Sequence, residues 1–338
     1  MIYNSVYILR TAREFVAENR KLASPNPGYV TLQYLYCGIC GGDYSYYLGR
    51  RTNYPATLGH EFAGQIIAQE TSSRFSLGDI VVSDLNYRCG SCSFCHEGKS
   101  HLCIHNADGY FSNRGFASYG NIQEDYLYLI PEMEWLPRAC IIEPLSCVIH
   151  ACEMLLIKPD NHILLVGGGS IGSMFVFYLT SCLRCRYVAV SEKIGRRAQN
   201  LKDCFGINIS VEENIPYDLV IDCSNDPDGT LQALHAAKPG GSICIMSHLY
   251  GLDTSFIYEE ICRKELRPCF PLRNGQPKNL RQAISCIAEY WDPFFDQLIH
   301  VYDDLNTAFA EKEHSPWNKH VVKMFRENAT EQGVRSID

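Results

Sequence analysis

Apolar and polar positions follow two different patterns along the chain. Residues 1–145 contain short runs rich in β-branched and aromatic residues, separated by turn sequences such as PNPG and SLGD. Runs of this kind, bounded by Gly, Pro, Asn and Ser, are typical of strands. The pattern predicts an irregular β-rich domain, with its clearest strands at 29–36, 62–68 and 80–83.

From about Cys147 onward, apolar strands alternate with helical segments. This alternation predicts a parallel sheet covered by helices on both faces, and therefore an α/β fold class. The predicted strands are 162–166, 187–190, 218–222 and 242–246, and the predicted helices are 170–181, 196–203 and 230–237.

The alternation stops after Asp292. The remaining residues contain a predicted helix at 305–312 and a predicted strand at 319–324. Composition alone leaves open whether these elements return to the first domain.

Composition excludes several classes of protein. A chain of 338 residues is long enough for two domains, and 46% hydrophobic and 20% charged residues are ordinary for a folded globular protein. A net charge of −8 without any block of five like charges argues against nucleic-acid binding. No apolar run approaches the roughly 20 residues of a membrane span, and charges interrupt the N-terminal stretch where a signal peptide is apolar. We therefore expect a cytoplasmic protein that binds neither nucleic acid nor membrane.

Four of the 17 cysteines are closely spaced, as Cys89-x2-Cys92-x2-Cys95-x7-Cys103. Four thiolates at this spacing can enclose a tetrahedral Zn2+ and leave no coordination position for substrate, which predicts a structural zinc site. Four unrelated thiols and a four-cysteine iron–sulfur site are the alternatives. The isolated cysteines are expected to pack in the core as free thiols.

A second candidate metal site is divided between two segments. Cys40 lies in the sequence CGICGGD, and His60 and Glu61 follow about twenty residues later. One thiolate, one imidazole and one carboxylate suit Zn2+ and can leave a position open. Asp43 is a candidate for the acid that holds the histidine in one tautomer. On spacing alone, a redox pair of Cys37 and Cys40 and a structural His-Glu pair are alternatives.

The third motif is Gly167-x-Gly169-x-x-Gly172, directly after the predicted strand 162–166. Strand, glycine-rich turn and helix in this order are the context of a dinucleotide-binding fingerprint, in which the helix N-terminus faces the phosphates. Glu192 ends the next strand, where an acid can accept hydrogen bonds from the adenosine ribose. The predicted cofactor-binding residues are Gly167, Gly169, Ser170, Ile171, Gly172 and Glu192.

Together these motifs resemble those of the zinc-dependent medium-chain dehydrogenases, a family that includes alcohol, sorbitol and threonine dehydrogenases. The matching stretches are CGICGGD at 37–43, GHE at 59–61, the four-cysteine lobe at 89–103, EP at 143–144 and GGGSIG at 167–172. The resemblance implies a GroES-like catalytic domain at 1–146, to which 293–338 returns, and a Rossmann dinucleotide-binding domain at 147–292. It also implies an alcohol or polyol dehydrogenase with a catalytic and a structural zinc ion in each chain.

The family pattern assigns roles to individual residues. Cys40, His60 and Glu61 match the ligands of the catalytic zinc, and Glu143 matches an acid that in polyol dehydrogenases reaches the metal directly or through water. Cys37 is not a ligand in this pattern, which implies a packed thiol.

The resemblance also bears on the cofactor. Glu192 matches the acid that selects NAD over NADP, and Arg197 matches a basic residue beside the adenosine. The cluster of Lys193, Arg196 and Arg197 keeps NADP as the alternative, because it offers cations for a 2′-phosphate.

The chain departs from the family at the proton relay. Gly42 stands where a Ser or Thr hydroxyl usually passes the alcohol proton to solvent, and Ser45 stands where a relay histidine often lies. Ser45, Tyr46 and a zinc-bound water near Glu143 are the candidates for this role.

A narrower resemblance concerns the substrate. Cys-x-x-Asp-x-x-Tyr-Tyr-x-Gly-x-Arg from Cys40 to Arg51, with Ser315-x-Trp317-x-Lys319, is similar to reductases that interconvert ribulose 5-phosphate and ribitol 5-phosphate. It implies a polyol or polyol-phosphate substrate, with Arg51 and Arg273 as the substrate-binding cations. That branch lacks the cysteine lobe and favours NADPH, unlike this chain. A cyclitol or amino alcohol is the alternative substrate, and a non-catalytic zinc- and nucleotide-binding protein is the alternative function.

The family resemblance finally implies an oligomer, either a homodimer or a homotetramer. A late strand of the Rossmann domain, at 266–270, would join two sheets edge to edge. Pro268 is tolerated best at such an edge, since it removes one hydrogen-bond donor from the ladder.

Overall fold

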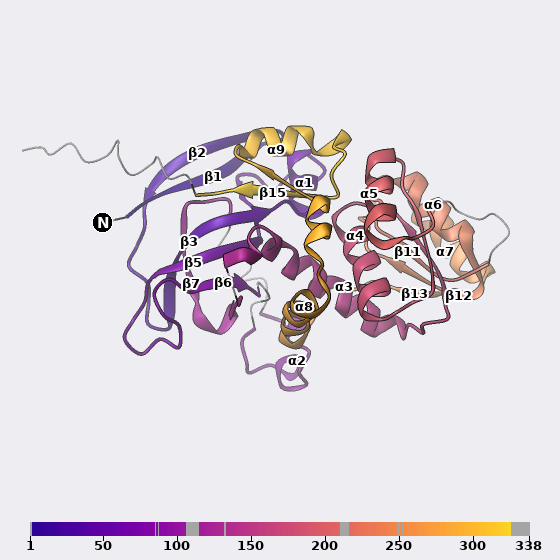
Figure 1. Ribbon diagram of the computed structural model, residues 1–338, viewed down its shortest axis with the longest axis horizontal. Helices are drawn as coiled ribbons and strands as arrows, with labels where there is room; N and C mark the ends of the chain where they lie inside the picture. The colour runs from indigo at the N-terminus through magenta and orange to yellow at the C-terminus, as the bar shows by residue number, and fades with distance from the viewer. Residues whose placement is uncertain are drawn as a thin grey trace, which may run out of the picture.

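The computed structural model describes residues 2–84, 86, 88–105, 115–131, 133–209, 216–248, 251 and 253–325. These residues form three sheets, two on one side of the molecule and a parallel sheet on the other, as Figure 1 shows. The predicted α/β fold class is confirmed. No helix within these residues has the length and apolar character needed to cross a membrane.

The first half of the molecule is built on a seven-stranded sheet of order β14-β15-β3-β5-β6-β8, with β7 paired to β3. A smaller sheet has the order β2-β1-β4. In β3, the alternating residues Val30, Leu32 and Tyr34 are buried, as expected for a strand with one face on the core. The strands are β1 (Tyr3–Thr11), β2 (Glu14–Lys21), β3 (Tyr29–Gly38), β4 (Ala56–Thr57), β5 (Glu61–Ala68), β6 (Ile80–Ser83), β7 (Tyr119–Gln123), β8 (Leu127–Leu129), β14 (Ile299–Tyr302) and β15 (Lys319–Lys323).

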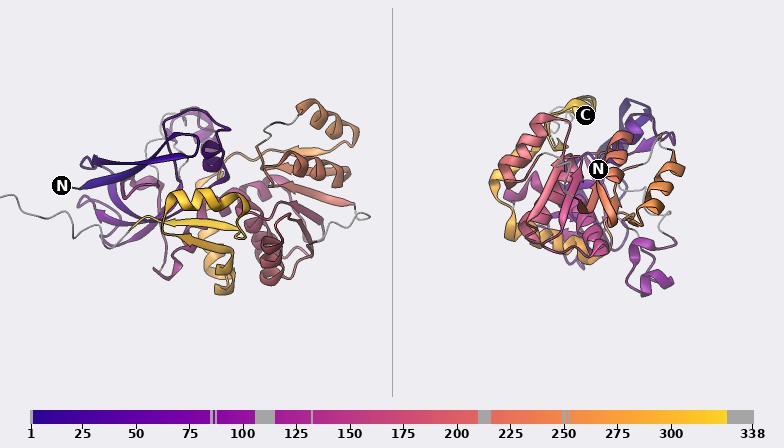
Figure 2. Two further views of the ribbon diagram at one scale, coloured as in Figure 1. Left: turned by 90° about the horizontal axis from the view of Figure 1, so that it is seen from above. Right: turned by 90° about the vertical axis from the view of Figure 1, so that its right-hand side faces the viewer.

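The C-terminal strands lie within this first sheet. β15 pairs antiparallel with β3, with Val322 opposite Cys37, and parallel with β14. Figure 2 shows the yellow C-terminal elements among the indigo strands of the N-terminal half. Residues 326–338 of the predicted returning segment lie outside the described residues.

The second half contains a five-stranded parallel sheet of order β10-β9-β11-β12-β13. Ile163 and Leu165 of β9 pack on one face with α3, α4 and α8, and Leu164 and Val166 pack on the other face with α6 and α7. Both faces are therefore covered, as predicted. The strands are β9 (His162–Val166), β10 (Tyr187–Ser191), β11 (Tyr217–Asp222), β12 (Ala237–Ile245) and β13 (Arg267–Cys269).

The helices connect and cover these sheets. α8 packs along α3 between the two halves, as Figure 1 shows. The predicted domain junction at residues 146 and 147 falls inside α3, and dividing the chain there stays a prediction. The helices are α1 (Gly41–Tyr47), α2 (Ser93–His96), α3 (Ile142–Leu155), α4 (Ser170–Phe177), α5 (Gly195–Phe205), α6 (Pro227–Ala236), α7 (Thr254–Arg263), α8 (Pro277–Tyr290) and α9 (Leu305–Glu311).

Some elements differ from the sequence prediction. The helix predicted at 170–181 changes at Tyr178 from α-helix to a π-helical turn that ends at Cys182. β12 begins at Ala237, which was expected to end a helix. The helix α3 was not predicted, because it is buried on most of its surface and shows no clear polar face.

An aromatic cluster holds α1 and α9 together in the first half. The ring centroid of Phe309 in α9 lies 4.9 Å from that of Phe15, 5.1 Å from Tyr47, 5.6 Å from Phe116 and 6.3 Å from Tyr44. Tyr44 and Tyr47 belong to α1, so α9 fixes the helix that directly follows the candidate metal ligand Cys40.

Phe309→Ala is expected to lower the free energy of unfolding by about 3–5 kcal/mol, since it removes a fully buried ring and leaves a cavity. Urea denaturation measures this loss. Phe294→Ala is the matched control, because the Phe294 side chain is 56% exposed and its truncation should change stability by only about 0.5 kcal/mol. Equal losses in the two variants would contradict the role of the cluster.

Candidate active site

Cys40, His60 and Glu61 converge at the ends of two paired strands. Gly38, the last residue of β3, lies opposite Glu61, the first residue of β5, so the register brings Cys40 to the start of β5. The potential ligand atoms of Cys40, His60 and Glu61 all lie within 4.8 Å of one another. A thiolate, an imidazole and a carboxylate at this spacing fit a zinc ion.

Neighbouring groups contact Cys40 and His60. The main-chain N–H of Gly42 donates to Sγ of Cys40 at 3.4 Å. The buried Asp43 carboxylate lies 3.6 Å from Nδ1 of His60. This carboxylate favours a proton on Nδ1, which would leave Nε2 for a metal.

Cys37 is not poised as a redox partner of Cys40. Its side chain is completely buried, and a Cβ added to Gly59 would come within 2.9 Å of its Sγ. Burial raises the pKa of the Cys37 thiol well above its usual value. Both Cys37 and Cys40 are free thiols, which agrees with a packed role for Cys37.

Glu61 forms a buried ion pair with Lys319 of β15. Nζ of Lys319 donates to Oε2 of Glu61, and both side chains are almost completely buried. A Cβ added to Gly38 would lie 2.6 Å from Oε2 of Glu61, so a glycine is needed beside the pair. A carboxylate has two oxygens, so pairing through Oε2 is compatible with metal coordination through Oε1.

Glu143 lies in the first turn of α3, within electrostatic range of His60 and Glu61. Burial raises the pKa of Glu143 to about 7, and the nearby His60 opposes this effect. Sγ of Cys147, one turn later, donates to Oε1 of Glu143 at 3.6 Å. The structure places Glu143 near His60 and Glu61, and its own coordination of the metal stays a prediction.

The two candidate relay residues on α1 have other contacts. The Ser45 hydroxyl is buried and donates to the main-chain oxygen of Gly41 at 3.0 Å. The main-chain oxygen of Tyr46 accepts from the Tyr54 hydroxyl at 2.5 Å. Neither contact assigns a proton relay, so the relay stays a prediction.

The four-cysteine cluster forms a separate metal-binding group. The sulfurs of Cys89, Cys92, Cys95 and Cys103 lie within 4.8 Å of one another around α2. The hydroxyl and the main-chain N–H of Ser91 donate to Sγ of Cys89 at 3.4 and 3.5 Å, and these bonds lower the pKa of Cys89 to about 5. Four sulfurs in this arrangement fit a closed, structural zinc site.

The glycine-rich turn between β9 and α4 has the shape that a dinucleotide requires. Gly167 has a φ of 96°, and a Cβ added there would come within 2.8 Å of Ser224. A Cβ on Gly172 would overlap the oxygen of Gly167, whereas the space around Gly169 is open. The Ser170 hydroxyl at the start of α4 is shielded from solvent and has no partner among the described residues. These features fit a phosphate group at the helix N-terminus.

Glu192 is fixed beside this turn. Its Oε2 accepts from the N–H of Gly168 at 2.6 Å, and its Oε1 accepts from the N–H of Ile194 at 2.8 Å. The neighbouring Lys193 forms an ion pair with Asp226. An anionic carboxylate therefore lies at the end of β10, where the adenosine ribose is expected.

Arg197 contacts the chain that returns to the first half. Its Nε donates to the main-chain oxygen of Trp317 at 3.0 Å, and its Nη2 donates to that of Lys312 at 3.1 Å. Arg197 was predicted to lie beside the adenosine. In the structure its guanidinium also binds the main chain of the C-terminal segment, a contact that was not predicted.

The two predicted substrate-binding arginines, Arg51 and Arg273, lie in different surroundings. Nη2 of Arg51 is 3.3 Å from Nε2 of His248, which follows β12, and its guanidinium lies 5.5 Å from the Tyr46 ring centroid. Arg51 therefore lies between the two halves. Arg273 lies near His101 of the cysteine lobe, where burial, His150 and Arg273 lower the pKa of His101 to about 4.

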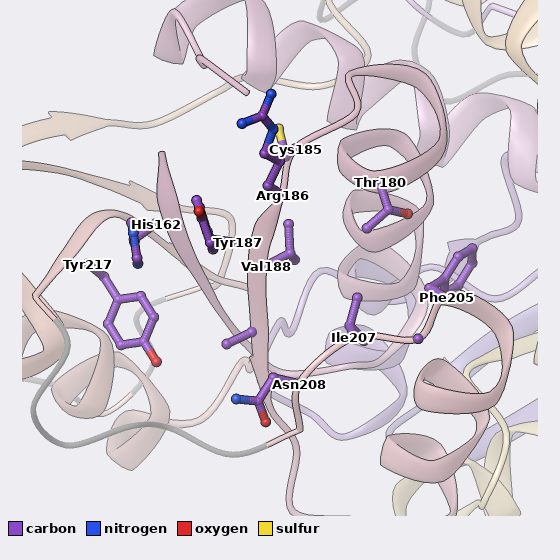
Figure 3. Close-up of a pocket in the computed structure, with 12 residues that line it drawn as sticks. His162, Thr180, Cys185, Arg186, Tyr187, Val188, Phe205, Ile207, Asn208 and Tyr217 are labelled. Carbon is purple, nitrogen blue, oxygen red and sulfur yellow. The ribbon is translucent and has the colours of Figure 1, made fainter. Parts of the chain in front are cut away.

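A cavity of about 410 Å³ lies beside the edge strand β10, as Figure 3 shows. His162, Tyr187 and Tyr217, which line it, are the first residues of β9, β10 and β11. Dinucleotides bind at the carboxyl ends of parallel strands, so this cavity is at the wrong end of the sheet for the candidate site.

Comparison with known proteins agrees with this geometry. Residues 26–132 match the alcohol dehydrogenase GroES-like domain. This match, the mixed α/β fold and the relatives below confirm the resemblance to zinc-dependent medium-chain dehydrogenases.

Individual relatives include two sorbitol dehydrogenases and a solved alcohol dehydrogenase structure. The chain is 34% identical over 180 residues to the sorbitol dehydrogenase of Bacillus subtilis, an alignment that spans 50% of each chain. It is 25% identical over 295 residues to the sorbitol dehydrogenase of Halalkalibacterium halodurans, covering 81% of this chain and 85% of the relative. Among solved structures, an alcohol dehydrogenase from Escherichia coli complexed with NADH superposes with a TM-score of 0.81 at 23% identity, covering 95% of this chain and 99% of the other. That structural likeness shows the shared fold.

Three residues near these sites have no role in the sequence prediction. Lys319, Asn318 and Cys147 each contact a predicted site residue or the glycine turn. For Lys319 a signal was present, since a lysine that begins the apolar strand KHVVK needs a buried partner. For Asn318 and Cys147 the sequence offered none.

We expect the purified protein to hold about two zinc ions per chain, one in each group. Cys40→Ser should lower the content to about one without unfolding the protein. Cys92→Ser should also remove one ion and should lower the melting temperature, because a structural zinc contributes folding energy. Metal analysis by mass spectrometry measures both. A fully active wild-type preparation with about one zinc per chain would contradict two sites.

Proposed function

We propose that the protein is a zinc-dependent oxidoreductase that transfers a hydride between NAD and a polyol-type secondary alcohol or the corresponding ketone. The observation that carries this proposal is the closeness of the two candidate sites. Asn318 donates to the glycine turn and the next residue, Lys319, pairs with Glu61 of the metal triad. Consecutive residues lie about 3.8 Å apart at Cα, so the two sites are neighbours.

In this proposal Cys40, His60 and Glu61 hold zinc, which would act as a Lewis acid on the substrate oxygen. Asp43 keeps His60 in the tautomer that binds metal. The turn from Gly167 to Gly172 holds the dinucleotide, which carries the redox chemistry. Both sorbitol dehydrogenases that the chain resembles support a polyol as the substrate class.

The proposal favours NAD over NADP. The Glu192 carboxylate lies beside the glycine turn, and its charge opposes a 2′-phosphate. Lys193 is engaged by Asp226 and Arg197 by main-chain oxygens, so two of the three cations that could favour NADP have other partners.

We further propose a homodimer or homotetramer. β13 lies at the edge of the parallel sheet, and Pro268 in its centre pairs with β12 on one side only. An edge of this kind can join to the same edge of a second copy.

Purified enzyme with zinc is expected to reduce NAD when a panel of free and phosphorylated polyols is added, followed by the absorbance of the reduced cofactor. Cys40→Ala should abolish the rate, since it removes a ligand of the catalytic metal. The ratio of kcat/KM values for NAD and NADP tests the cofactor proposal. A preference of about tenfold or more for NADP would overturn it. Binding of both cofactor and zinc without turnover of any polyol would instead favour a non-catalytic protein.

Arg51→Ala and Arg273→Ala are expected to raise KM for a phosphorylated polyol by about ten- to a hundredfold, since hydrogen bonds between arginine and a phosphate are strong. The KM for the unphosphorylated parent should change far less. Arg20→Ala is the control, because Arg20 is exposed on β2 and pairs with Glu18. Steady-state kinetics on both substrates measure the ratio. If parent and phosphate respond alike, a free polyol or cyclitol is the better assignment.

A further inference from the structure

The residues that lead into β15 touch both candidate sites. We call residues 315–319 the strap. Within it, the side chain of Asn318 is 1% exposed and donates from Nδ2 to the main-chain oxygen of Gly168 at 2.7 Å. The next residue, Lys319, forms the buried ion pair with Glu61. Two consecutive residues therefore connect the glycine turn to a predicted metal ligand.

Further hydrogen bonds fix the strap on α5. The main-chain oxygen of Trp317 accepts from Nε of Arg197 at 3.0 Å. Nδ2 of Asn200, a residue that is 1% exposed, donates to Oδ1 of Asn318 at 3.2 Å. The Asn318 amide is thus held at both its oxygen and its nitrogen, so it is not free to rotate away from the turn.

The main chain of Gly168 is held from both directions. Its N–H donates to Glu192, on the side of the adenosine ribose, and its oxygen accepts from Asn318. A dinucleotide that binds this turn approaches the same short stretch of main chain. A shift of that stretch on binding would change the hydrogen bond to Asn318, and through it the position of Lys319.

We propose that the strap couples the dinucleotide site to the metal site, with Asn318 as the positioning residue that transmits occupancy of the glycine turn to Glu61. The inference rests on the proposed function only in assigning a dinucleotide and a metal ion to these two sites. A purely structural strap would hold the two halves together but would leave the metal environment independent of the dinucleotide.

The test uses full-length protein in which Co2+ replaces Zn2+, because the visible spectrum of Co2+ reports the geometry of its ligands. NADH is titrated into the wild type, and binding is followed by its fluorescence. We expect NADH to shift the spectrum of the cobalt in the open site. In Asn318→Ala the dissociation constant of NADH should rise about five- to tenfold, and the spectral shift at saturating NADH should be lost.

Asn4→Ala is the matched control. Nδ2 of Asn4 donates to the main-chain oxygen of Tyr119 at 2.7 Å, the same bond at the same distance, but within the first half of the molecule. This variant should keep both the NADH affinity and the spectral shift. Melting temperatures of both variants reveal any general loss of stability. Asn318→Leu, which keeps a side chain of similar size but has no donor, replaces Asn318→Ala if that variant does not fold.

The cobalt experiment can fail independently of the polyol oxidation assay. The strap proposal is overturned if wild-type protein binds NADH with no change in the cobalt spectrum. It is also overturned if the Asn318 variant shows the full wild-type shift at saturating NADH, or if Asn4→Ala loses the shift equally. If NADH shifts the cobalt spectrum of a protein that oxidises no polyol, the result would support the strap proposal and contradict the proposed reaction.

Discussion

The buried ion pair between Lys319 and Glu61 is the constraint on which the arrangement of the first half depends. An ammonium group without solvent contact is strongly unfavourable unless it has an opposite charge, and the Lys319 side chain is completely buried. Its partner begins β5, more than two hundred residues earlier in the chain, so the C-terminal strand must return to the first sheet. Gly38 is part of the same constraint, because any side chain at that position would collide with the pair. The pair therefore links the sheet topology to the chemistry of the metal triad.

The candidate active site forms where three distant segments meet. The ends of β3 and β5 supply the metal-binding side chains, the turn after β9 supplies the surface for a dinucleotide, and the strap lies between them. Each segment ends or begins a strand, so its position is set by a hydrogen-bonded ladder rather than by a long loop. Groups that must be held within a few tenths of an ångström are best supported in this way.

Much of this could be predicted from the sequence, because the signals were local. The glycine turn, the four-cysteine cluster and the strands of the parallel sheet each occupy one short stretch, in which spacing and apolar pattern carry the information. The triad of Cys40, His60 and Glu61 required the family resemblance, since its spacing alone also fitted other interpretations. The contacts of Asn318 and Arg197 could not be predicted. They depend on how the C-terminal segment packs against α5, and no periodicity or spacing encodes a packing between residues more than a hundred positions apart.

The cysteines show how one residue type takes two roles according to its surroundings. In the lobe, hydrogen bonds from Ser91 lower the pKa of Cys89 and thereby favour the thiolate that a metal binds. In the core of the parallel-sheet half, burial raises the pKa of the Cys152 thiol well above the usual value, so this thiol stays protonated and packs as a small apolar group. Counting cysteines therefore says little about this protein. The donors around a sulfur help to separate the two roles. Ser91 donates to Cys89 in the lobe and Gly42 donates to Cys40, each from the turn that carries the cysteine.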